Sequence, residues 1–124
     1  MKNQNTNEPD TNQLDWRHHR RRGDELMQEE LRWQAYEEYA QVLRLNPNDA
    51  YELYEIAESI FASGNTQVAL EFCEASLKVE RHFHTLYLMS EILAVLGLPQ
   101  EAAAYREESL RLEDAYTENK RNHR

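Results

Sequence analysis

The chain has 124 residues, which is enough for one domain with a modest core. Its formal charge is −9, and residues 24–119 carry 20 acidic against 6 basic residues, so this stretch repels nucleic acid and anionic lipid. The single cysteine, Cys73, excludes an internal disulfide and is typical of a reducing compartment. Residues 1–13 contain no secretory signal, and no window reaches the roughly 18 apolar residues of a membrane span. We therefore expect a cytoplasmic protein.

The pattern of apolar residues predicts an all-α chain. Residues 1–13 are polar and have almost nothing to bury, which predicts a disordered tail. From Leu14 the apolar residues recur at spacings of three and four, as six helices require, and the helices are separated by turns at Asn46-Pro47, at Gly64 and at Gly97-Leu98-Pro99. The helical domain is expected over residues 14–116, followed by a basic frayed tail over 117–124. The same spacing predicts which side chains of the last four helices face inward: Leu53, Ile56, Ala57, Ile60, Ala69, Phe72, Cys73, Ser76, Leu77, Leu86, Met89, Ser90, Leu93, Ala102, Tyr105, Ser109 and Leu110.

Small side chains repeat along these predicted helices. A small residue lets two antiparallel helices approach closely, because it leaves room for the facing backbone and a large partner side chain. Three sets of residues recur with the same spacing, 34 positions from the first repeat to the second and 33 from the second to the third. This shared spacing predicts three repeated helical hairpins. The sets are Gly23, Ala57 and Ser90 on the first helices, Ala35, Ala69 and Ala102 on the second helices, and Leu43, Leu77 and Leu110 near the second-helix ends.

This repeat resembles the tetratricopeptide repeat family over Trp16–Tyr116. The family likewise places a small residue in each helix and a proline in the linker, which Pro47 supplies after the first repeat. The resemblance implies a right-handed α-solenoid of three helix-turn-helix hairpins, with repeats at about 16–49, 50–82 and 83–116. Two departures stand out. His19 and Arg22 replace large apolar residues, which predicts loose packing, and the linker at Arg81 and His82 is one residue short, which predicts a changed angle between repeats.

In that family the first helices line a concave groove. The resemblance implies that this groove presents Arg17, Arg20, Asp24 and Met27 from the first repeat, Tyr51, Tyr54, Glu58 and Phe61 from the second, and His84, Tyr87, Glu91 and Val95 from the third. The spacing of the second set, at intervals of three and four, independently predicts a stripe separate from the core stripe. Tyrosine suits a binding face because it joins a large apolar body to a hydroxyl. The alternative is that these tyrosines pack between repeats.

The predicted function is therefore protein binding. An acidic, aromatic groove favours a partner segment that is apolar and basic. Grooves of this family that grip a terminal carboxylate use lysine, asparagine and arginine at fixed positions, and we expect no such binding here. The residues that stand at those positions are Arg20, Asp24, Glu55, His84 and Leu88.

Two other roles within protein interaction stay open. The run of arginines from Arg17 to Arg22 opposes the acidic body, so copies of the chain could associate through the sixth helix as a scaffold, because no full capping helix follows it. The small acidic chain with three repeats is also similar to type III secretion chaperones, although its polar amino-terminal stretch, Met1 to Gln13, does not resemble their dimerisation helix.

Metal and catalytic roles are not expected. The histidine pairs His18–His19 and His82–His84 stand one and two positions apart, whereas two zinc ligands on one helix face are four apart. No cysteine–histidine or serine–histidine arrangement for a nucleophile is apparent, and Cys73 is expected to be a buried small hydrophobe. We predict no enzyme activity, no metal and no cofactor.

Overall fold

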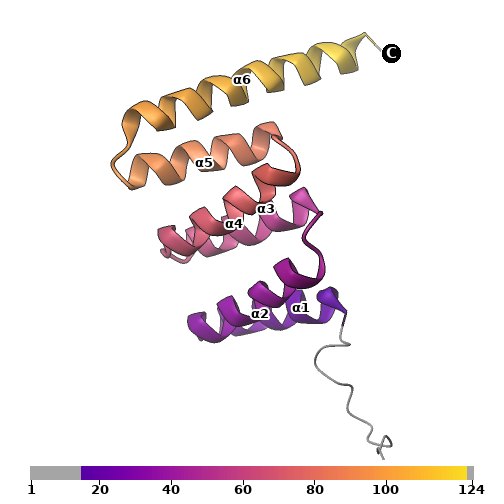
Figure 1. The fold of residues 1–124 in the computed structure, drawn as a ribbon, viewed down its shortest axis with the longest axis vertical. Helices are drawn as coiled ribbons and strands as arrows, with labels where there is room; N and C mark the ends of the chain where they lie inside the picture. The colour runs from indigo at the N-terminus through magenta and orange to yellow at the C-terminus, as the bar shows by residue number, and fades with distance from the viewer. Residues whose placement is uncertain (1–14, 123–124) are drawn as a thin grey trace, which may run out of the picture. The chain divides into compact units, whose positions relative to one another are not determined.

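The computed structural model describes residues 15–122, in which every regular element is an α-helix and no strand occurs. The prediction of an all-α chain is confirmed. The chain divides into two compact units, Met1–Pro47 and Asn48–Arg124. Among residues 15–122 no helix combines the length and the hydrophobicity that a bilayer crossing needs. The helices are α1 (Trp16–Gln28), α2 (Arg32–Leu45), α3 (Ala50–Ala62), α4 (Thr66–Val79), α5 (Phe83–Val95) and α6 (Pro99–Arg121) (Figure 1).

The first unit is a pair of helices in close contact, α1 and α2. Gly23 on α1 faces the ring of Tyr39 on α2, and a Cβ atom added at Gly23 would lie only 2.5 Å from Cε1 of that ring. Tyr39 is fully buried, and its hydroxyl donates a hydrogen bond to Asp24 Oδ1 at 2.6 Å. Glycine at position 23 therefore allows α1 and α2 to pack closely, as the sequence predicted.

His19 packs into this hairpin instead of loosening it. The side chain is buried, and the ring Nδ1 lies 2.7 Å from Glu38 Oε1 on α2. Because a carboxylate only accepts hydrogen bonds, the imidazole N–H is the donor. Arg22, the other departure from the family pattern, is exposed and lies 3.6 Å from Glu25 Oε1. A polar pair thus fills a position where an apolar side chain was expected.

The turn between α1 and α2 has a strained residue. Glu30 has a φ of +62°, whereas the corresponding turns carry Gly64 at +99° and Gly97 at +82°. Each of these turn positions follows the small residue of its own first helix at the same offset, so all three keep the register of the predicted repeat. The Leu31 amide donates to the Leu26 carbonyl at 2.9 Å, which closes the helix in the way that a left-handed residue allows. Glutamate occupies the one turn of the three that lacks glycine.

Replacing Glu30 with glycine is expected to stabilise the chain. A side chain in the left-handed region costs about 1–2 kcal/mol, and glycine removes that cost but adds freedom to the unfolded chain. We therefore expect a net gain of about 1 kcal/mol in the free energy of unfolding, measured by urea denaturation. Glu29→Gly is the matched control, because Glu29 is also exposed but has an ordinary φ of −84°. An equal gain in both variants would contradict the explanation.

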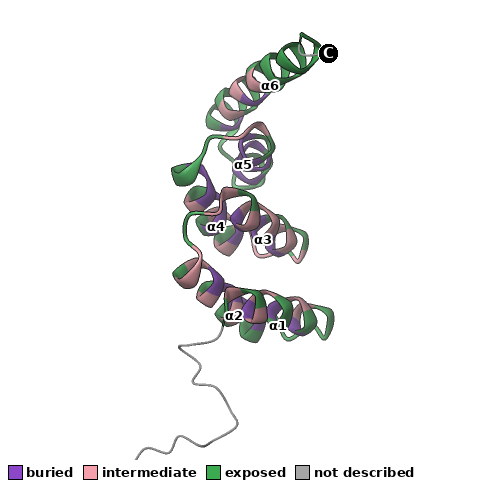
Figure 2. Cartoon of the chain, turned by 90° about the vertical axis from the view of Figure 1, so that its right-hand side faces the viewer, coloured by how far each residue is buried: buried purple, intermediate pink, exposed green. Residues whose placement is uncertain are grey.

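The second unit contains α3 to α6, and α5 lies at its centre. Contacts join α3 to α4, α5 to α6, α4 to α5 and α3 to α5. Figure 2 shows α5 as largely buried, while most of α6 is exposed. The predicted inward residues of α3, α4 and α5 are all buried, and α5 buries three more. Those confirmed are Leu53, Ile56, Ala57, Ile60, Ala69, Phe72, Cys73, Ser76, Leu77, Leu86, Met89, Ser90 and Leu93, and the additional ones are Thr85, Leu88 and Ile92.

A serine bridge repeats in both hairpins of the second unit. Ser76 on α4 donates to the carbonyl of Ala50, the first residue of α3, at 2.7 Å. Ser109 on α6 donates to the carbonyl of Phe83, the first residue of α5, at 2.8 Å. The two donors and the two acceptors are displaced along the chain by the same number of positions. The two hairpins therefore repeat a specific contact as well as a pattern of residue sizes.

The last helix differs from the prediction in two ways. Leu110 was expected to face inward but is 50 % exposed, because Ser109 takes the buried position against α5. The helix also continues to Arg121, past the expected end near residue 116, and Figure 1 shows it reaching beyond α5. Residues 117–121 of the predicted tail are thus helical. The predicted tail at 1–13, Leu14 and the last two residues lie outside the described part of the chain.

Candidate functional site

Helix α3 presents two stripes of side chains on different sides. Its buried stripe is Leu53, Ile56, Ala57 and Ile60. Because each residue advances about 100° around a helix, the centre of the predicted groove stripe lies about 130° from the centre of the buried stripe. Tyr51 is 60 % exposed, Glu58 is exposed, and Tyr54 and Phe61 are half-buried. The stripe therefore faces away from the core of the second unit.

Helix α5 leaves only a narrow line of side chains exposed. Packing against α3, α4 and α6 covers seven of its thirteen residues. The four residues that the resemblance assigned to the groove, His84, Tyr87, Glu91 and Val95, are all exposed. We refer to Tyr51, Tyr54, Glu58 and Phe61 of α3 together with His84, Tyr87, Glu91 and Val95 of α5 as the acidic aromatic face.

Ring contacts connect the two helices of this face. The centroids of Tyr51 and Tyr54 lie 5.9 Å apart, and the Tyr54 ring stacks on the His84 imidazole with a centroid separation of 6.0 Å. His84 also contacts Phe83 at 4.4 Å, and Phe83 contacts Tyr116 of α6 at 5.6 Å. A run of rings therefore crosses from α3 through α5 to α6. The sequence placed Tyr54 in a stripe on α3. In the structure its ring also contacts α5 through His84.

The charged side chains that α3 and α5 contribute to this face are carboxylates. Helix α3 contains Glu52, Glu55 and Glu58, helix α5 contains Glu91, and neither helix contains a lysine or an arginine. Tyr54 donates a hydrogen bond to Glu58 Oε2 at 3.2 Å, and burial together with this carboxylate raises its pKa to about 12. A side-chain hydrogen bond to Glu55 and its negative charge raise the pKa of Tyr51 as well. Both phenols therefore stay protonated donors at neutral pH.

A shallow hollow adjoins the α5 part of the face. It has a volume of about 340 Å³, and small side chains of α5 and α6 line much of it. The Arg106 guanidinium lies over the Tyr87 ring, 5.2 Å from its centroid, and supplies a positive charge at this end. The hollow could accept an apolar side chain of a bound segment. Its lining residues are Tyr87, Ser90, Glu91, Ala94, Pro99, Ala102, Ala103 and Arg106.

The groove residues predicted on α1 belong to the first unit. Arg17 is exposed, and its guanidinium lies 2.8 Å from Asp15 Oδ2 and 4.7 Å from the Trp16 ring centroid. Arg20 is half-buried, and its Nε lies 3.3 Å from Asp24 Oδ1. Both arginines are thus held by acids of their own helix or its cap. Their place in a peptide groove stays a prediction.

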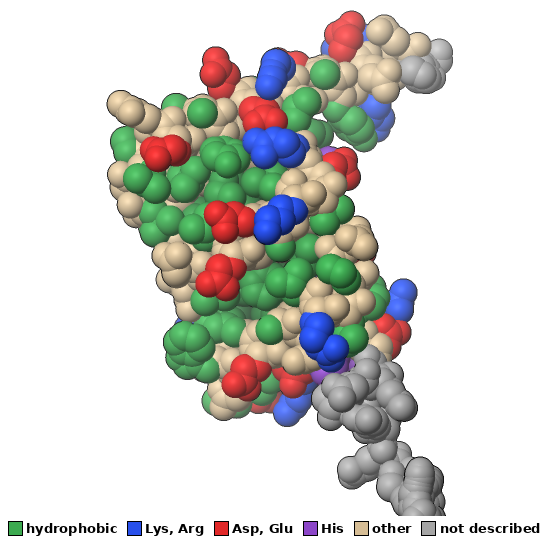
Figure 3. Space-filling view, in the orientation of Figure 1, with side chains coloured by type: hydrophobic (Ala, Val, Ile, Leu, Met, Phe, Trp, Pro, Cys, Tyr) green, Lys and Arg blue, Asp and Glu red, His purple; other side chains and the backbone are tan. Residues whose placement is uncertain are grey.

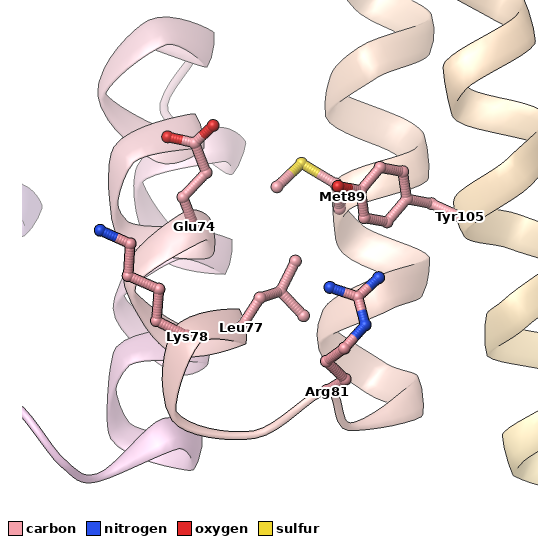
Figure 4. Close-up of a pocket in the computed structure, with 6 residues that line it drawn as sticks. All are labelled: Glu74, Leu77, Lys78, Arg81, Met89 and Tyr105. Atoms are coloured by element: carbon pink, nitrogen blue, oxygen red, sulfur yellow. The ribbon is translucent and has the colours of Figure 1, made fainter.

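A second hollow, with a volume of about 400 Å³, lies outside the predicted site. Figure 3 shows hydrophobic side chains across much of the surface between α4 and α6, broken by a few charged ones. In Figure 4, Leu77 of α4 and Met89 of α5 form the floor, and Tyr105 of α6 closes one side. Arg81 donates two hydrogen bonds to Glu108, at 2.7 and 2.9 Å, and its guanidinium lies 5.6 Å from the Tyr105 ring centroid.

No pattern in the sequence pointed to this arrangement. The short linker drew attention to Arg81, but the side of the bundle on which Arg81 would lie depends on how α6 packs. The Arg81 guanidinium holds the pKa of Glu108 below its usual value through the same two hydrogen bonds. Arg81 therefore ties the α4–α5 linker to α6. Two of its donors are bonded to Glu108, and the other charged side chains that line the hollow are Glu74 and Lys78 (Figure 4).

Cys73 is fully buried, as predicted. Its Sγ lies 3.5 Å from the Thr85 carbonyl oxygen, and burial raises the pKa of the thiol to about 12. A thiol that stays protonated at neutral pH is a poor nucleophile, because the thiolate is the reactive form. Cys73 therefore acts as a small core side chain at the contact between α4 and α5.

In comparisons of the sequence with known proteins, neither a family model nor a curated protein matches this chain.

Proposed function

We propose that this chain is a protein-interaction module that binds a segment of another polypeptide across the acidic aromatic face. The observation that carries the proposal is the composition of that face. The exposed rings of Tyr51 and Tyr87 and the half-buried ring of Tyr54 lie on helices that contain carboxylates, with no lysine or arginine on either α3 or α5. Tyrosines at the centre of an interface contribute large contact area and a hydroxyl donor, and a negative surface favours a positive partner. The partner segment is therefore apolar and basic.

The proposal includes a tetratricopeptide-like architecture. Three helical hairpins would stack as a right-handed solenoid, and α1 would extend the groove with Arg17 and Arg20. Two repeated features support this part: the left-handed turn positions at 30, 64 and 97, and the serine bridges of Ser76 and Ser109. In such a module the role is that of an adaptor, an assembly factor or a chaperone, and no catalysis is involved.

Removing two rings from the face tests the proposal. The wild-type chain is first used to capture and identify a partner, and the affinity of the purified pair is then measured by calorimetry. The double variant Tyr54→Ala with Tyr87→Ala is expected to weaken binding at least about 100-fold, since a central aromatic side chain contributes about 2 kcal/mol or more. Its helical circular dichroism should be unchanged, because Tyr87 is exposed and Tyr54 is only half-buried, outside the buried stripe of α3.

The matched control removes two exposed rings elsewhere. Trp33, which is 71 % exposed on α2, and Tyr116, which is 51 % exposed on α6, lie outside the acidic aromatic face. The variant Trp33→Ala with Tyr116→Ala should bind within about threefold of wild type, since exposed residues outside an interface contribute little to affinity. Normal binding by the Tyr54 and Tyr87 variant would show that the partner docks elsewhere, for example on the exposed Leu110 and Tyr116 side of α6.

A further inference from the structure

Within residues 15–122, four aromatic side chains carry a cation from the chain itself. Arg17 lies over Trp16, Arg81 over Tyr105, Arg106 over Tyr87 and Lys120 over Tyr116, at 4.7 to 5.6 Å from the ring centroids. In the same described part of the chain, neither Tyr51 nor Tyr54 has a lysine or arginine over its ring, although Tyr51 is one of the most exposed aromatic side chains. No lysine or arginine of this part of the chain therefore occupies either ring, and His84 is the ring that stacks on Tyr54.

Two carboxylates border these two rings. Tyr51, Tyr54, Glu55 and Glu58 occupy positions i, i+3, i+4 and i+7 of α3, which places all four on one face of the helix. The Tyr54 hydroxyl donates a hydrogen bond to Glu58 Oε2 at 3.2 Å, and Glu55 follows Tyr51 at the same spacing of four positions. The Glu58 carboxylate therefore lies at the hydroxyl end of the Tyr54 ring. The arrangement offers two flat apolar surfaces with negative charge along one edge.

We infer that this stripe of α3 is a subsite for one arginine side chain of the bound segment. The inference rests on the proposed function and names the residue that the face recognises. A guanidinium is planar, stacks on aromatic rings and pairs with carboxylates through several donors, whereas the ammonium of lysine is a compact and strongly hydrated charge. Glu52 adds negative charge on the same helix.

A second contact of the bound segment is expected at the hollow between α5 and α6. The hollow between α5 and α6 borders Tyr87, and Tyr54 is stacked on His84 of the same helix α5. Arg106 already covers Tyr87, so a cation is disfavoured there and an apolar side chain is favoured. The segment therefore presents its arginine to α3 and an aliphatic side chain to α5.

Two blocked peptides that differ in one group test the subsite. The first is acetyl-Ser-Leu-Arg-Leu-Ser-amide, and the second replaces arginine with citrulline, which has nearly the same shape but no charge. Binding to the full chain is followed by the NMR shifts of the α3 amides and of the Tyr51 and Tyr54 ring protons. A stacked and paired guanidinium contributes about 1.4 kcal/mol, so the arginine peptide is expected to bind about tenfold more tightly.

The carboxylates are tested with a matched pair of variants. Glu55→Gln with Glu58→Gln should abolish the tenfold preference for arginine, while Glu71→Gln with Glu74→Gln should preserve it. Glu71 and Glu74 are exposed on α4, have the same spacing and give the same change in charge. Equal binding of the arginine and citrulline peptides on the acidic aromatic face would overturn the subsite and leave the proposed function standing. Shifts centred on other helices, or no saturable shifts, would also overturn the subsite, and the ring-removal experiment would then decide the proposed function separately.

Discussion

Gly23→Val is expected to destabilise the chain by about 3 kcal/mol, the upper end of the range for overpacked cores. Even a Cβ atom at position 23 would lie 2.5 Å from Tyr39 Cε1 and 2.8 Å from Cδ1, well inside van der Waals contact. The ring cannot move away easily, because Tyr39 is fully buried and its hydroxyl is bonded to Asp24. Valine adds two methyl groups to this clash. The loss should be visible as a lower urea midpoint in circular dichroism.

A double-mutant cycle separates the clash from the effect of valine on the helix itself. Tyr39→Leu removes the ring that meets position 23 and leaves an apolar side chain in its place. In that background, Gly23→Val should cost less than about 1 kcal/mol, because adjacent substitutions that relieve one another are not additive. If Gly23→Val costs the same in both backgrounds, the close contact between α1 and α2 is not the cause. An unchanged urea midpoint for Gly23→Val alone would show that a side chain at position 23 does not clash with Tyr39.

Ala69→Leu is expected to destabilise the second unit by about 1–3 kcal/mol. Ala69 is fully buried on α4, the helix that packs against both α3 and α5. Leucine adds three carbon atoms where the structure leaves no exposed surface, so α3 or α5 must move or the side chain must leave its preferred rotamer. Heat denaturation followed by circular dichroism measures the loss as a lower midpoint.

The same substitution at an exposed alanine is the control for Ala69. Ala104 lies on α6, two positions after the buried Ala102 that corresponds to Ala69 in the repeat. Ala104→Leu should change the stability by less than about 0.5 kcal/mol, as surface substitutions usually do. Equal losses at Ala69 and Ala104 would mean that the lower stability reflects leucine itself. The buried position of the repeated alanines would then have no special importance for packing.

Much of the local structure follows from the sequence, because helices and their ends depend on nearby residues. The spacing of apolar residues placed the buried faces of α3, α4 and α5 correctly. The helix caps are local as well: Asp49 accepts a hydrogen bond from the Glu52 amide and Asn65 from the Val68 amide, both at 3.1 Å. The resemblance assigned His84, Tyr87, Glu91 and Val95 of α5 to the groove, and all four are exposed.

Contacts between helices were decided by the tertiary structure. Nothing in the periodicity distinguishes Ser109 from Leu110 as the buried residue of α6, because the choice depends on which flank meets Phe83. The same holds for the stacking of Tyr54 on His84 and for the pairing of Arg81 with Glu108, which join side chains far apart in the sequence. The sequence alone determined that these side chains exist on given helical faces. Packing determined their partners, because a side chain finds a distant partner only once the helix axes and rotations are fixed.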